Sequence, residues 1–129
     1  MGLALLALST AAAETCVIPE SWTAMVVEQP QPSTIALKLP PTPVKIGEPF
    51  TVDILVCADQ QPETGSLKLD ATMPAHRHGM NYKPEIQPVA DNIYRVSGMF
   101  FHMPGEWQIT VDLLSDDIMQ RFFLKVPAR

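Results

Sequence analysis

FTVDILVCA, residues 50–58, alternates apolar and polar side chains along most of its length. The apolar side chains at every second position are Phe50, Val52, Ile54 and Val56. Successive side chains of a strand point to opposite faces of a sheet, so this spacing predicts a strand with one face on a core. The same alternation returns at residues 67–73, where charged Lys68 and Asp70 separate apolar neighbours.

Working outward, further strand patterns occur at residues 22–28, 34–39, 93–101, 107–113 and 122–126. Residues 82–89 contain Pro84 and Pro88, which allow at most an edge strand. The chain has 13 prolines and shows no sustained helical periodicity after residue 13. Seven or eight short strands separated by turns predict an all-β fold, an immunoglobulin-like antiparallel β-sandwich. A closed β-barrel is the alternative.

Length and charge narrow the classes of function. The 129 residues are enough for one domain with a real core. The net charge is −5 and no basic cluster occurs, which argues against nucleic-acid binding. No nucleophile stands out beside a base, and no phosphate loop or dinucleotide fingerprint is present, so we expect no enzyme.

Residues 1–13 resemble the end of a secretory signal. The apolar run Leu3–Leu8 is too short to span a bilayer, and Ala11-Ala12-Ala13 supplies small residues for cleavage. We therefore expect a mature domain of residues 14–129, exported to the periplasm as a soluble protein without a transmembrane helix. The alternatives are a helix packed into the fold and a lipid anchor at Cys16, whose preceding residues do not fit such a site.

Export also changes how the two cysteines are interpreted. Cys16 and Cys57 are an even pair, and disulfides persist in oxidising compartments. We favour a disulfide that ties the N-terminal segment to the strand at Cys57. The alternative is a thiolate metal ligand at Cys57, but no His or Met follows it at short spacing.

All three histidines and four of the seven methionines lie in two stretches, residues 73–80 and 99–105. In an extended chain, His76, His78 and Met80 would point to one side, because they are spaced by two residues. The later segment adds His102 and Met103. These five residues, His76, His78, Met80, His102 and Met103, form our predicted metal site.

Copper suits this set of donors better than other metals. Thioethers are soft ligands that favour Cu(I), whereas structural zinc prefers four Cys or His ligands. A site dominated by imidazoles can also hold Cu(II). Blue-copper centres need a Cys with nearby His and Met, which the surroundings of Cys57 do not supply.

The same residues support a resemblance to a known family. The order of Met73-Pro74, His78-Gly79-Met80, Tyr94–Phe100 and Met103–Trp107 resembles the YtkA-like/FixH-like domains over residues 45–127. The resemblance implies an immunoglobulin-like fold outside the cytoplasm and a link to copper handling or respiratory-oxidase assembly. It also adds Met73 and Met99 to the candidate ligands. A cleavable leader, instead of the retained membrane anchor of FixH-like proteins, favours a soluble carrier.

The sequence thus supports two hypotheses of function. In the first, the protein is a periplasmic copper-binding carrier, chaperone or oxidase-assembly accessory that passes its ion to a periplasmic or membrane-complex partner. In the second, it is an interaction module of a cell-envelope system that binds no metal, with the turns 73–80 and 101–105 forming a protein-docking end. Convergence of the ligand atoms would favour the first.

Overall fold

A computed structural model describes Gly2 and residues 16–129. The expected leader and the expected mature start at Glu14 lie outside the described residues, apart from Gly2. No helix in the described part is long and apolar enough to cross a membrane.

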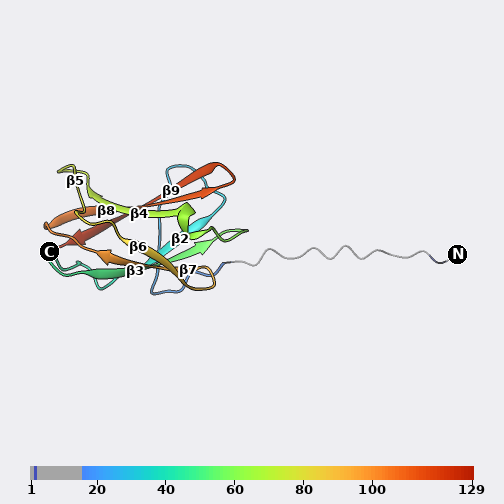
Figure 1. Cartoon of the computed structure of the whole chain (residues 1–129), viewed down its shortest axis with the longest axis horizontal. Helices are drawn as coiled ribbons and strands as arrows, with labels where there is room; N and C mark the ends of the chain where they lie inside the picture. The colour runs from blue at the N-terminus through green and yellow to red at the C-terminus, as the bar shows by residue number, and fades with distance from the viewer. Residues whose placement is uncertain (1, 3–15) are drawn as a thin grey trace.

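The described chain forms two antiparallel sheets stacked on each other (Figure 1). The first sheet has the order β1 (Thr23–Ala24), β2 (Thr34–Lys38), β3 (Phe50–Cys57), β7 (Ile93–Met99) and β6 (Glu85–Ala90). The second has the order β5 (His78–Gly79), β4 (Leu67–Met73), β8 (Gly105–Ser115) and β9 (Ile118–Ala128). One 3-10 turn, η1 (Thr64–Ser66), precedes β4. The predicted all-β sandwich is confirmed, and the two separate sheets exclude a closed barrel.

The differences from the predicted strands have simple causes. The described residues form nine strands instead of seven or eight, and β1 and β5 are only two residues long. The expected strand at residues 22–28 shrinks to β1 because only Thr23 and Ala24 pair with β2. The proline-bearing β6 pairs only with β7 and lies at the sheet edge, as the prolines require.

The core lies between the sheets and follows the predicted alternation. In β4, the four odd-numbered side chains from Leu67 to Met73 are buried. Trp107 begins the buried stripe of β8 and is fully buried, as the sequence predicted. The ring of Phe101 lies parallel to the indole of Trp107, with ring centroids 4.4 Å apart. It also meets the ring of Phe50 in β3 edge to face, with ring centroids 5.0 Å apart. These aromatic rings join the two sheets at one end of the sandwich.

The opposite end is closed by a disulfide. Cys16 and Cys57 are bonded, with Cα atoms 5.6 Å apart, so the predicted pairing is confirmed and no described cysteine is free. Because β3 runs from Phe50 to Cys57, the disulfide and the Phe50–Phe101 contact lie at opposite ends of that strand. We call the first the disulfide end and the second, which carries the β4–β5 turn, the His/Met end.

Candidate metal centre

The first half of the candidate centre is the hairpin formed by β4 and β5. Residues 74–77 form its turn, in which the carbonyl of Met73 accepts a hydrogen bond of 3.1 Å from the backbone N–H of His76. Arg77 has a positive φ of 53° and leads the chain back into β5. The register pairs Met73 with His78, and cross-strand partners share a face of a sheet. His78 therefore lies at the rim of the face that carries buried Met73.

The second half is the segment between β7 and β8. The indole N–H of Trp107 donates a hydrogen bond of 3.0 Å to the carbonyl of Met103, which closes the turn into β8. Gly105 has a φ of +137°, and a Cβ built there would lie 2.6 Å from the Met73 methyl group. Glycine is therefore required at position 105, where this turn passes the Met73 side chain of β4. This close approach brings the two halves together.

The two segments bring His78 and His102 near each other. Their ring centroids are 6.5 Å apart and their planes are nearly perpendicular, at 86°. His102 also lies against Trp107, with ring centroids 5.6 Å apart. The Nδ1 atom of His102 is buried and has no hydrogen-bond partner among the described residues. A buried polar atom without a hydrogen-bond partner costs free energy of folding. His102 is therefore the side chain of this cluster whose hydrogen-bonding capacity is least satisfied within the fold.

The other predicted residues lie in different surroundings. Met80 and Met103 are partly buried and pack against the core, and they belong to the segments that carry His78 and His102. Met73 and Met99 are fully buried core residues. His76 is exposed in the β4–β5 turn, and among the described residues its ring contacts neither of the other imidazoles.

The arrangement was only partly foreseeable. An extended chain would have placed His76, His78 and Met80 on one side, but residues 74–77 form a turn, and only His78 and Gly79 are in a strand. The contact between His102 and Trp107 went unpredicted, because residues 100–104 belong to no strand and alternation gives no side-chain direction there. The five-residue separation of His102 and Trp107 around Pro104-Gly105 was the only signal in the sequence.

The separation of the His78 and His102 rings can be compared with the separation that a shared metal ion would require. An ion about 2 Å from one nitrogen of each ring would hold the two ring centroids roughly 5–6 Å apart. The observed 6.5 Å therefore requires a small approach and a ring rotation, since the rings now meet edge to face. The described residues contain no group of three His, Cys, Asp or Glu side chains able to hold an ion. A thioether of Met80 or Met103 could supply a third side-chain donor, which would favour a soft ion.

One of the comparisons with known proteins identifies the family of this chain. A family model described as YtkA-like matches residues 27–112, about two thirds of the chain. No curated protein and no solved structure gives a significant match. The matched residues include strands β2 to β7 and both segments of the candidate centre. The chain therefore belongs to the YtkA-like family.

Proposed function

We propose that this protein binds one copper ion at the His/Met end, with His78 and His102 as its imidazole ligands. The observation that carries the proposal is the buried, unpartnered Nδ1 atom of His102, which lies in a ring 6.5 Å from the ring of His78. A bound ion would supply the missing partner of this nitrogen. His102 is held in place by Trp107, whereas His78 is exposed on a two-residue strand.

A thioether completes the proposed site. Met80 follows β5 directly and Met103 follows His102, so each sulfur is carried by a segment that already bears one imidazole. Two imidazoles and a thioether form a soft donor set, which favours Cu(I) over zinc, calcium or magnesium. His76 keeps its place among the candidate ligands only if the β4–β5 turn rearranges on binding.

The proposed role is that of a carrier. His78 lies in a strand that pairs with β4 through only two residues, so this ligand can move with little loss of sheet structure. Easy withdrawal of one ligand suits transfer to a partner better than storage. We place the carrier in the periplasm, because the disulfide would persist in an oxidising compartment. Its partner would be a periplasmic or membrane-complex protein, such as an oxidase under assembly, and we propose no enzymatic activity.

Copper titration tests the proposal. The protein is loaded with Cu(I) under reducing conditions and with Cu(II) under oxidising conditions, desalted, and assayed for retained metal. The disulfide is checked after each reducing run. We expect one equivalent to be retained under at least one condition, because two imidazoles and a thioether can close on one ion. His78→Ala and His102→Ala should each lower the affinity by about tenfold or more.

His76→Ala is the matched control, since His76 is an exposed histidine two residues from His78. It should bind copper as the unaltered protein does. Full retention of copper by both the His78 and the His102 variants would overturn the proposed ligands. Failure of the unaltered protein to retain copper in either state would overturn the function itself.

A further inference from the structure

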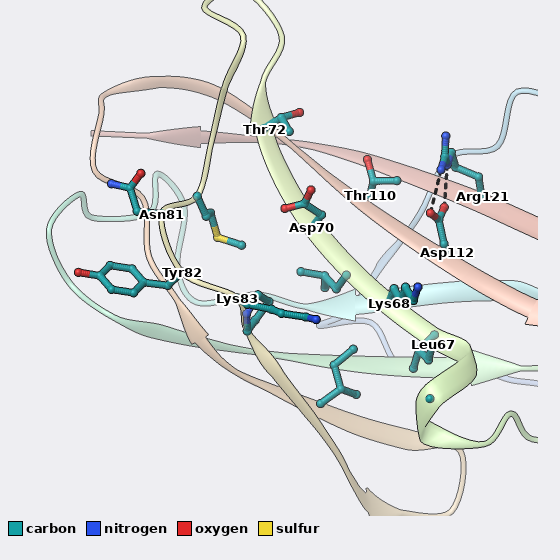
Figure 2. Close-up of a pocket in the computed structure, with 15 residues that line it drawn as sticks. Leu67, Lys68, Asp70, Thr72, Asn81, Tyr82, Lys83, Thr110, Asp112 and Arg121 are labelled. Atoms are coloured by element: carbon teal, nitrogen blue, oxygen red, sulfur yellow. Dashed lines mark hydrogen bonds and ion pairs between the residues drawn. The ribbon is translucent and has the colours of Figure 1, made fainter.

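A groove runs beside β4, on the second sheet, and of the candidate copper ligands only Met80 lines it. Its volume is about 910 Å³. One wall is β4 with the outer face of β8, and the other is the segment that leads from Met80 to Ile86 (Figure 2). Residues of both sheets therefore line the groove.

The backbone of β4 is unpaired along this groove. Ala71 turns both of its backbone groups away from β8: its N–H donates to the Asp70 carboxylate at 2.8 Å, and its carbonyl accepts from the N–H of Met80 at 3.3 Å. The direction of the backbone N–H and carbonyl groups alternates from residue to residue along an antiparallel strand. The backbone groups of Leu69 and Leu67 therefore point away from β8, as those of Ala71 do. Strand β5 pairs only with Thr72 and Met73. Within the described chain, the N–H and carbonyl of Leu69 thus face the groove without a strand partner.

The side chains along the groove give it a chemical character. Lys68 and Lys83 line it, and neither forms an ion pair with a described residue. Figure 2 shows Lys83 reaching across toward β4. Two carboxylates also line the groove: Asp112 is bound by Arg121, with 2.7 Å between its Oδ1 and the arginine Nε, and Asp70 accepts the N–H of Ala71. With three basic and two acidic side chains, the groove has a small excess of positive charge on a chain whose net charge is −5.

The inner side of the groove is apolar. Met80 and Ile86 line it, and both are partly buried against the core. A strand added beside β4 would point alternate side chains toward these apolar groups and toward the lysines.

We propose that this groove binds an extended segment of a partner protein, in which acidic and apolar residues alternate, as an added strand on β4. The backbone of Leu69 and Leu67 would supply the main-chain hydrogen bonds of β-strand addition, and Lys68 and Lys83 would select acidic side chains. Because Met80 lines the same groove, the bound segment would lie beside the His/Met end. The proposal rests on the exposed edge and the charges alone and does not require a bound metal.

A second copy of this chain fits the edge poorly. Symmetric pairing about Leu69 would place Lys68 opposite Asp70 of the other copy, which is favourable. It would also place Leu67 of one copy opposite Ala71 of the other, where the N–H of Met80 already occupies the Ala71 carbonyl. Only a few residues of edge remain free, so a short peptide segment fits better than a second β4.

Three blocked hexapeptides test the proposal against the whole metal-free protein. The first is Ac-Val-Glu-Val-Glu-Val-Glu-amide. The second replaces each Glu with Lys, and the third replaces the inner Val residues with Pro, which removes backbone donors but keeps the charge. Binding is followed by amide hydrogen exchange and by titration at low salt. We expect the first peptide to slow exchange at Leu69 and the other two to bind at least about tenfold more weakly.

Charge reversal supplies the variant and its control. The double substitution Lys68→Glu and Lys83→Glu should lower the affinity for the acidic peptide by about tenfold or more. The substitution Lys125→Glu, at an exposed position outside the groove, should leave that affinity unchanged. Equal binding of the acidic and basic peptides would overturn the proposal, as would binding that leaves exchange at Leu69 unchanged. Protection of Leu69 that rises with protein concentration without peptide would assign the edge to a second copy and also overturn it.

Discussion

The two ends of this sandwich treat their buried polar groups in opposite ways. At the disulfide end, the side chain of Gln120 is buried, and its Oε1 accepts a hydrogen bond of 3.0 Å from the backbone N–H of Ser33. At the His/Met end, the Nδ1 atom of His102 is buried and finds no hydrogen-bond partner in the described part of the chain. The hydrogen bond of Gln120 stabilises the fold. The unpartnered Nδ1 atom of His102 lowers stability, and no described hydrogen bond compensates for it.

The difference separates a structural end from the end at which we propose the copper site. The disulfide end also has a covalent bond between Cys16 and Cys57. The His/Met end is held by aromatic contacts and by a two-residue strand, β5. A buried polar atom that lacks a partner calls for an explanation, and a bound ion is one of those that would account for it. Substitutions at the two ends should therefore differ in the sign of their effect on stability.

The largest effect is expected from the disulfide. Replacing Cys16 and Cys57 with Ser should lower the free energy of unfolding by about 3–4 kcal/mol, because the bond closes a loop across a sequence separation of 41 in the unfolded chain. Urea denaturation measures the change. The unaltered protein under strong reductant is the control and should show the same loss.

Copper retention by this double Ser variant sharpens the comparison. If the two ends are independent, a folded double variant should retain copper as the unaltered protein does. Loss of copper from a variant that is still folded would show that the ends are coupled, which contradicts the separation drawn above.

A smaller loss is expected from the buried amide. Gln120→Leu keeps most of the side-chain volume but leaves the N–H of Ser33 buried without an acceptor. An unsatisfied buried donor costs about 1–3 kcal/mol, which denaturant unfolding can resolve. Gln108→Leu, at a half-buried position of β8, is the control and should change stability by less than about 0.5 kcal/mol. Equal effects of the two substitutions would remove the structural role assigned to Gln120.

A pH-dependent effect is expected at the disulfide end. Burial raises the pKa of Tyr94 above its ordinary value of 10.0, and its hydroxyl lies 3.2 Å from Gln61 Oε1 and 3.1 Å from the carbonyl of Pro62. The unfolded chain thus loses this proton first, so the stabilisation is complete below pH 10.0 and is lost as the pH rises through the raised pKa.

Urea midpoints measured near pH 8 and near pH 11 check this expectation. The fall in midpoint should be smaller in Tyr94→Phe than in the unaltered protein. Tyr82→Phe, at an exposed tyrosine, should leave the fall unchanged. The same fall in all three proteins would show that Tyr94 does not govern stability in this range.

The sequence predicted some elements fully and others hardly at all. Strand β4 begins and ends at the predicted residues because its alternation is unbroken from Leu67 to Met73. The disulfide was favoured because only two cysteines were present. Strand β5 escaped prediction, since a two-residue strand has no periodicity and depends on the turn at residues 74–77.

The site was predicted as a set of residues but not as an arrangement. The approach of His78 to His102 depends on Gly105 passing the Met73 side chain, a contact within the second sheet between segments that are far apart in sequence. No local pattern encodes such a contact. The buried state of the His102 Nδ1 atom likewise depends on packing beside Trp107, which only the folded structure reveals.

The smallest change in stability is the most informative of the series. His102→Phe keeps an aromatic ring beside Trp107 but removes the nitrogen that has no partner, so no hydrogen bond within the fold is lost. Stability should stay within about 0.5 kcal/mol of the unaltered protein or rise slightly, because a buried polar atom without a partner is replaced by an apolar one. Copper binding should nevertheless be lost. Denaturant unfolding and copper retention, measured on the same sample, separate the two effects, with His76→Phe as the exposed control. A loss of more than about 1 kcal/mol would mean that His102 has a structural partner after all, and the contrast with Gln120 would fail.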